Sequence, residues 1–206
     1  MTDADRERAS TADREYADRL RRLGDKRWKR LLGAQAPFRW NVRRLHLGRT
    51  LDIGCGIGRN LAHLDGNGVG VDHNPVSIAT ARARGLEAYT AEEFGQSPAA
   101  VPRSFDSMLL AHVVEHMGVL DAITLIRTYL SYLKPTGQVC LITPQESGYR
   151  SDPTHVRFVD FDGLAELADA VGLHVTRQYS FPLPRSLGRV FRYNESVQVA
   201  TWQRRP

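Results

Sequence analysis

Three side chains that could bind a metal ion or move a proton stand close together in the segment His112-Val113-Val114-Glu115-His116. They follow Phe105 to Ala111, whose apolar run predicts a buried strand. If the chain turns helically after this strand, residues three and four positions apart share one face, so that His112, Glu115 and His116 converge. Two imidazoles and a carboxylate suit a divalent cation and leave positions open for substrate oxygens.

A cation at this site would suit chemistry on an alcohol, which is a poor nucleophile near neutral pH. A bound cation lowers the pKa of the alcohol and fixes its oxygen in place. Two other interpretations remain open. One histidine could act as a general base without a metal, or His112 and His116 could only satisfy backbone groups at the strand end.

A glycine-rich loop is the second segment suited to ligand chemistry, and it reads Asp52-Ile53-Gly54-Cys55-Gly56-Ile57-Gly58. Its missing side chains let the backbone turn tightly and approach a bound molecule. A nicotinamide-binding loop would normally place its third glycine one position later, where this chain has Arg59. The acid at Asp52 also argues against a pyrophosphate at this loop.

A carboxylate follows eighteen residues beyond Gly54, where Asp72 ends the strand predicted over Gly68 to Asp72. It could accept hydrogen bonds from both hydroxyls of a ribose. The loop and this acid together resemble the class I S-adenosylmethionine (SAM)-dependent methyltransferases, most strongly from Arg49 to Pro144. Their signature is an acidic residue and Gly-x-Gly-x-Gly after the first strand, then an acid that ends the second.

The resemblance implies SAM as the cofactor. It places the three loop glycines against the amino acid part of SAM and Asp72 at its ribose. Beside the adenine it implies Glu92, Glu93 or Phe94, although the family more often has an Asp directly after the third strand, where this chain has Ala91. The full set of expected cofactor-binding residues is Asp52, Gly54, Cys55, Gly56, Gly58, Asp72, His73, Glu92, Glu93, Phe94 and Ala111.

The histidine-rich segment resembles the Glu-x-x-Glu-His element of metal-dependent methyltransferases that modify the terminal ribose of small RNAs, and of ubiquinone-pathway O-methyltransferases. Glu115 and His116 match that element, whereas His112 replaces its first Glu. A later histidine completes the ligand set in the RNA enzymes, and His155 is its counterpart here. The resemblance therefore implies His112, Glu115, His116 and His155 as catalytic and metal-binding residues, with Mg²⁺ or another divalent cation.

The size and layout of the chain are also similar to bacterial sugar O-methyltransferases, including the kind that caps the 1-hydroxyl of mannosides in methylmannose polysaccharide synthesis. We therefore expect a carbohydrate hydroxyl as the acceptor. Aromatic faces suit a sugar ring, and the candidates are Trp28, Trp40, Tyr149 and Tyr193. The alternatives are a metal-free enzyme acting on a phenol or amine, an RNA ribose 2′-O-methyltransferase, and a noncatalytic SAM-binding partner protein.

Alternating strand and helix patterns predict an α/β fold, with a Rossmann-like doubly wound sheet of seven strands. We expect an antiparallel pair at the sheet edge, because the last two strands have no room for a crossover helix between them. The strands are predicted over Arg49–Ile53, Gly68–Asp72, Leu86–Thr90, Phe105–Ala111, Gln138–Thr143, His174–Phe181 and Glu195–Trp202. Helices are predicted over Gly58–Leu64, Pro75–Arg84, Leu120–Leu133 and Phe161–Val171.

Further predictions concern the N-terminal region and two connecting segments. Residues 1–12 are predicted to be a mobile tail, followed by N-terminal capping helices from Tyr16 to Leu32 within a single domain of residues 13–206. Lys134 to Gly137 are predicted to form a turn. Pro182 to Arg192 are predicted to form a basic, mobile loop.

Composition limits the class of protein. The chain has 206 residues, 42% of them hydrophobic, which suits one buried core, and it shows no run long enough to span a bilayer. With only two cysteines, free thiols and a cytoplasmic location are expected. The net charge of +5 could favour anionic partners, but the basic residues near the N-terminus are interleaved with acids, so we do not expect nucleic acid. A homodimer is left open.

Overall fold

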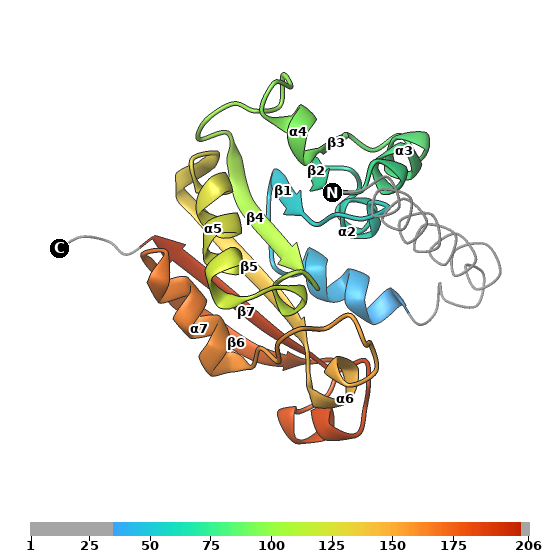
Figure 1. Ribbon diagram of the computed structural model, residues 1–206, viewed down its shortest axis with the longest axis vertical. Coiled ribbons are helices and arrows are strands. Elements are labelled where there is room, and N and C mark those ends of the chain that lie inside the picture. Colours follow the sequence, from blue (N-terminus) through green and yellow to red (C-terminus); the bar gives the residue numbers. More distant parts are fainter. Residues whose placement is uncertain (1–34, 203–206) are drawn as a thin grey trace, which may run out of the picture.

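The computed structural model describes residues 35–202, which form a seven-stranded sheet covered by helices on both faces (Figure 1). The strands, in chain order, are β1 Thr50–Ile53, β2 Gly68–Asp72, β3 Ala88–Thr90, β4 Phe105–Ala111, β5 Leu133–Pro144, β6 Leu173–Phe181 and β7 Glu195–Trp202. The sheet order is β3-β2-β1-β4-β5-β7-β6. Strands β1 to β5 pair in parallel, and β7 pairs antiparallel with both β5 and β6. The predicted doubly wound sheet with antiparallel strands at one edge is confirmed.

One face of the sheet carries the larger core. Apolar side chains of α4 (Ala91–Phe94), α5 (Val119–Leu130) and α7 (Phe161–Ala170) pack there against the strands. In α7, for example, Leu164, Leu167 and Ala168 recur at the helical spacing and are fully buried. Burial of these apolar side chains is the main contribution that holds the helices against the sheet.

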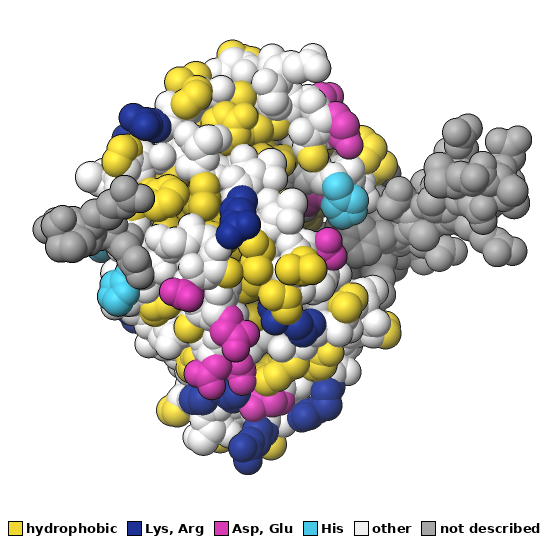
Figure 2. Space-filling model, turned by 60° about the vertical axis from the view of Figure 1, so that its left-hand side comes forward, with side chains coloured by type: hydrophobic (Ala, Val, Ile, Leu, Met, Phe, Trp, Pro, Cys, Tyr) yellow, Lys and Arg dark blue, Asp and Glu magenta, His cyan; other side chains and the backbone are white. Residues whose placement is uncertain are grey.

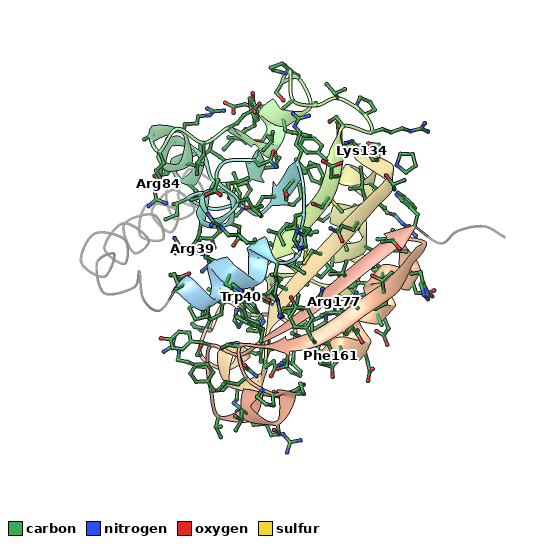
Figure 3. All side chains as sticks on the ribbon, turned by 180° about the vertical axis from the view of Figure 1, so that it is seen from behind. Arg39, Trp40, Arg84, Lys134, Phe161 and Arg177 are labelled. Carbon is green, nitrogen blue, oxygen red and sulfur yellow. The ribbon has the colours of Figure 1, made fainter. Side chains whose placement is uncertain are left out.

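The helical residues 35–43 cross the opposite face, where Figure 3 labels Arg39 and Trp40. Val42 and the following Leu45 and Leu47 pack against buried residues of β4, β5 and β7. The remaining helices lie in the loops between strands: α2 Arg59–His63, α3 Pro75–Ala83, α6 Glu146–Tyr149, and the 3₁₀ helices η1 Val114–His116 and η2 Arg185–Arg189.

The strand order reverses between β1 and β4, which lie side by side although two strands separate them in the sequence. In open parallel sheets, ligands bind beyond the carboxyl ends of the strands at such a switch point. The glycine-rich loop follows β1 and the histidine-rich segment follows β4. The fold therefore brings both predicted sites together at the carboxyl ends of the parallel strands.

The turn predicted over residues 134–137 is wrong, because β5 already begins at Leu133. The pairing of β5 with β4 shifts register there, since Phe105 lies opposite Leu133 but Ser107 lies opposite Gln138. Lys134 bonds to the Asp106 carboxylate at 2.6 Å beside this irregularity. The four residues with turn propensity thus form a bulged part of the strand.

The predicted tail and capping helices, including Trp28, lie outside the described residues. The segment 182–192, predicted as a loop, contains the 3₁₀ helix η2. It is also attached to α6, because Arg185 donates two hydrogen bonds of 2.7 Å to the Glu146 carboxylate. Both cysteines are free, as predicted, and both are buried. No helix of residues 35–202 has the length and apolar character needed to cross a bilayer. On the face shown in Figure 2, Lys and Arg lie interspersed with Asp and Glu.

Acid should destabilise the protein through His63, at the end of α2. Burial, followed by the charges of Arg59, Arg39 and Arg43, lowers the pKa of His63 to about 4. Between the ordinary pKa of 6.5 and this value, the unfolded chain takes up a proton that the folded one does not. The free energy of unfolding should therefore fall by ~2 kcal/mol as the pH drops from about 7 to about 5.

The measurement is urea unfolding at these two pH values, for wild type and His63→Gln. An amide side chain does not titrate in this range, so the variant should lose less stability on acidification than wild type, by the same ~2 kcal/mol. Equal losses in both proteins would show that His63 is not the group responsible.

Candidate functional site

The backbone after β1 adopts a conformation that glycine alone accepts readily, with φ of +72° at Gly54, +53° at Gly56 and +78° at Gly58. A Cβ on Gly54 would lie 2.5 Å from Val113 Cγ2, and one on Gly58 would overlap Leu86 Cδ1. A Cβ on Gly56 would meet nothing within 4 Å. Gly54 and Gly58 thus combine a positive φ with close neighbouring side chains, whereas Gly56 faces open space that a ligand can fill.

Gly56→Ala should weaken the binding of SAM by at least about tenfold, because the new methyl group would occupy this space. The matched control is Gly85→Ala. Gly85 also has a positive φ, of +76°, and open space around it, but it precedes β3 and so lies at the end of the sheet where the parallel strands begin. Both variants should lose a similar ~1 kcal/mol of stability from backbone strain. Calorimetric titration with S-adenosylhomocysteine (SAH) checks the prediction, and equal affinities for the two variants would contradict it.

Asp72 ends β2 directly beside this loop and is almost completely buried. Its Oδ2 accepts a hydrogen bond of 2.7 Å from the backbone N–H of Gly56, and its Oδ1 accepts one of 2.9 Å from Asn74. Each oxygen keeps a lone pair for a further donor. The carboxylate thus ties the loop to β2 and remains able to bind hydroxyl groups.

The other acid of the loop, Asp52, is fully buried. Burial raises the pKa of Asp52 to about 7; Arg59 and the side chain of Asn60 oppose the shift, and Asp72 adds to it. A buried carboxylate is costly unless donors or positive charge compensate it. Asp52 is therefore placed to respond to a positively charged ligand at the loop.

The remaining expected cofactor residues differ in exposure. The thiol of Cys55 lies in a small apolar cluster, so only its backbone faces outward, and burial raises its pKa. His73 is exposed, 3.4 Å from the Asp72 carboxylate, and Ala111 is buried at the end of β4.

Two of the three residues expected beside the adenine, Glu93 and Phe94, make contacts that stabilise the fold. Phe94 is 1% exposed and packs on Tyr129 and Tyr132, so it is a core residue in this structure. Glu93 forms a capping box with Thr90 and binds Arg82 at 2.6 Å. Glu92 is exposed and remains the side chain of this group that is free to meet a ligand.

Beyond β4, one possible ligand atom from each of Glu115, His116 and His155 lies within 4.8 Å of the other two. The predicted helical turn after the strand is present as η1. The segment of His155 is held against η1 because the N–H groups of Val156 and Arg157 both donate to the carbonyl of Glu115, at 2.8 and 3.1 Å. Two segments far apart in the sequence thus supply one cluster.

The hydrogen bonds of the two imidazoles favour cation binding. His155 Nδ1 lies 2.7 Å from the carbonyl oxygen of Tyr149, and His116 Nδ1 lies 3.2 Å from that of Thr154. A carbonyl can only accept, so each Nδ1 carries the hydrogen and each neutral ring has its lone pair on Nε2. Backbone carbonyls commonly orient metal-binding histidines in this way.

The carboxylate of the cluster also fits a cation. Glu115 is 0% exposed, and neither of its oxygens accepts a well-formed hydrogen bond from the described residues. The nearest positive partner is His112, whose Nδ1 lies 3.3 Å from Glu115 Oε1, and a divalent cation would compensate the buried charge more directly. Glu115, His116 and His155 therefore form a suitable donor set.

His112 occupies a different position from the other three predicted ligands. Its Nε2 lies 2.8 Å from Glu195 Oε1 and its Nδ1 lies 3.3 Å from Glu115 Oε1. Burial opposes protonation, but the interactions with Glu115 and Glu195 outweigh it and raise the pKa of His112 to about 9. Nε2 is thus hydrogen-bonded to Glu195, and Nδ1 lies beside the Glu115 carboxylate.

Two contributors to the site were missed in the sequence. Glu195 is the first residue of β7. It reaches the site because β7 runs antiparallel to β5 and so begins beside the carboxyl end of β5. The carbonyl of Tyr149 could not be inferred from any side-chain pattern. Of the predicted acceptor aromatics, Tyr149 stacks on His155 at 5.4 Å, whereas Trp40 and Tyr193 are exposed on other elements.

Comparison with known proteins identifies the family. A family model described as a methyltransferase domain matches residues 8–178, which is most of the chain. The chain belongs to this methyltransferase family. With the loop and acid described above, it is a SAM-dependent methyltransferase of the class I fold. A search of curated proteins finds no significant match.

Solved structures share the fold of this methyltransferase at low sequence identity. A chain from the complex of the Trm112 methyltransferase activator with a methyltransferase of Haloferax volcanii is 19% identical, with a TM-score of 0.67 over 93% of this chain and 96% of that chain. A SAM-dependent methyltransferase from Archaeoglobus fulgidus is 19% identical, with a TM-score of 0.62 over 79% and 92%. Magnesium protoporphyrin IX methyltransferase from Synechocystis, solved with SAH, is 15% identical, with a TM-score of 0.62 over 90% and 94%.

Proposed function

We propose that this methyltransferase transfers the methyl group of SAM to a carbohydrate hydroxyl, with a divalent cation such as Mg²⁺ held by Glu115, His116 and His155. The observation that carries the proposal is the convergence of these three side chains, with one ligand atom from each within 4.8 Å, at the strand ends beside the cofactor loop. Bound there, the cation would supply Lewis acidity, which lowers the pKa of a coordinated alcohol.

The protein's own residues prepare the site. The carbonyl of Tyr149 fixes the ring of His155, and the carbonyl of Thr154 fixes that of His116. Fixed ligands reduce the entropy lost when substrate and donor are brought together. Gly56, in the loop after β1, and Asp72, at the end of β2, would hold SAM, so that donor and acceptor meet at the switch point.

A carbohydrate suits this arrangement for two reasons. Three protein ligands leave open positions around a cation, and neighbouring hydroxyls of a sugar can fill them. The interspersed charges in Figure 2 offer no broad basic surface on that face of the kind that tracks a nucleic acid backbone. That face therefore lends no support to RNA as the acceptor, and the cluster supports a hydroxyl.

The test incubates the protein with labelled SAM and a panel of neutral oligosaccharides, after EDTA treatment and after addition of Mg²⁺ or Mn²⁺. We expect transfer to a sugar hydroxyl, located by mass spectrometry, that is lost in EDTA and restored by metal. Equal rates with and without metal would rule out the cation. Transfer to RNA that falls steeply with salt, or to a phenol or amine alone, would rule out the carbohydrate acceptor.

A further inference from the structure

A chain of three side chains links β7 to the proposed cation site. Glu195 Oε1 lies 2.8 Å from His112 Nε2, and His112 Nδ1 lies 3.3 Å from Glu115 Oε1. The side chains of Glu195 and Glu115 are 12% and 0% exposed and that of His112 is 30% exposed, so both carboxylates are largely shielded from water. We infer that Glu195 is a positioning residue, which acts through His112 to hold the Glu115 carboxylate in place for the cation.

This inference rests on the cation site proposed above and adds a role to residues outside its ligand set. Nε2 of the His112 ring is hydrogen-bonded to Glu195 Oε1, and Nδ1 of the same ring lies 3.3 Å from Glu115 Oε1. The ring thus lies between the two carboxylates, and its role in this proposal is to position Glu115.

The backbone of His112 restricts how this bridge can move. The residue has a φ of +60°, which is unusual for a residue other than glycine, and its N–H donates to the carbonyl of Ile142 at 2.9 Å. With the backbone fixed, the orientation of the ring depends on the partners of its two nitrogens. Removing Glu195 would release the ring on one side and loosen its hold on Glu115.

The Glu195 side chain is not needed to keep β7 in the sheet. The backbone of Glu195 is held by pairing with Pro144 and Phe181, and Gln145 Nε2 donates to its carbonyl at 3.1 Å. A change of the side chain should therefore affect cation binding more than folding. Outer partners of metal ligands typically change metal affinity by about ten- to a hundredfold when they are removed.

The experiment measures Mn²⁺ binding by calorimetry to full-length wild type, Glu195→Ala, Glu195→Gln and the matched control Glu146→Gln. We expect Glu195→Ala to raise the Kd of Mn²⁺ by at least about tenfold. Glu195→Gln should raise it less, because the amide oxygen still accepts from His112. Glu146 pairs with Arg185 on another element, so its variant should bind Mn²⁺ as wild type does. The Kd of SAH and the melting temperature should change little in all of them.

A double-mutant cycle tests whether Glu195 acts through His112. Glu195→Ala and His112→Ala should each weaken Mn²⁺ binding, and the double variant should be little worse than either one. Additive losses would overturn the inference, as would unchanged Mn²⁺ affinity in Glu195→Ala, or a loss of SAH binding and folding that accompanies the loss of metal. If wild type itself bound no Mn²⁺, the cation site would fail and this inference with it.

Discussion

Replacement of Glu115 by Gln is expected to lower kcat/KM for methyl transfer by at least about a hundredfold, which corresponds to ~3 kcal/mol. The two side chains have nearly the same shape, so the substitution mainly removes charge. Glu115 is the one carboxylate in the cluster with His116 and His155, and it is fully buried. Without that charge, two neutral imidazoles would bind a hard cation such as Mg²⁺ weakly.

Thermal unfolding with and without Mn²⁺ separates loss of the metal from loss of the fold. A cation that binds only the folded state raises its stability, so the melting temperature of wild type should rise with Mn²⁺ and that of Glu115→Gln should not. Glu146→Gln, which changes a carboxylate outside the cluster, should behave as wild type does. Full activity in Glu115→Gln would show that the cation is not needed for the reaction.

The fold was predictable because its signals are local. The spacing of apolar residues predicts alternating strands and helices, and β2, β4 and β7 begin and end at the predicted residues. The turn predicted at residues 134–137 failed because Pro135 and Gly137 have strong turn propensity, whereas pairing with β4 holds them in a bulged strand. Tertiary pairing here overrides a local preference.

The short helix α4 was not predicted, although the sequence carries a local signal for it. Thr90-Ala91-Glu92-Glu93 fits the capping-box pattern, which predicts a helix start. That pattern assigns Glu93 a structural role, and burial of Phe94 follows from the helix. Of the residues expected near the adenine, Glu93 and Phe94 are thus fixed mainly by folding requirements, whereas Glu92 is exposed.

The candidate metal site was predictable only in part. The i, i+1 pair Glu115 and His116 is visible in the sequence, and the resemblance to metal-dependent enzymes added His155. The engagement of His112 by Glu195 depends on β7 lying antiparallel beside β5, and no spacing along the chain reports such a contact. Long-range pairs of this kind follow from the order and direction of strands.

Asp72→Asn is expected to weaken SAH binding by at least about thirtyfold, or ~2 kcal/mol. Hydrogen bonds from ribose hydroxyls to a charged carboxylate are stronger than those to an amide, so removal of the charge weakens each of them. The variant also disturbs the loop. Asp72 accepts from both Gly56 and Asn74 with different oxygens, and an amide can offer an oxygen to only one of these two N–H groups.

The two consequences can be separated by measuring binding and stability together. Asp65→Asn is the matched control, because Asp65 is exposed, lies at the other end of α2 and pairs only with Arg43 among the contacts of the described residues. It should leave the Kd of SAH unchanged. If Asp72→Asn lowered stability but bound SAH as tightly as wild type, the acid would serve the loop alone. A loss of affinity in Asp72→Asn without a loss of stability would instead indicate a direct contact between Asp72 and the cofactor, because a disturbed loop would lower the stability as well.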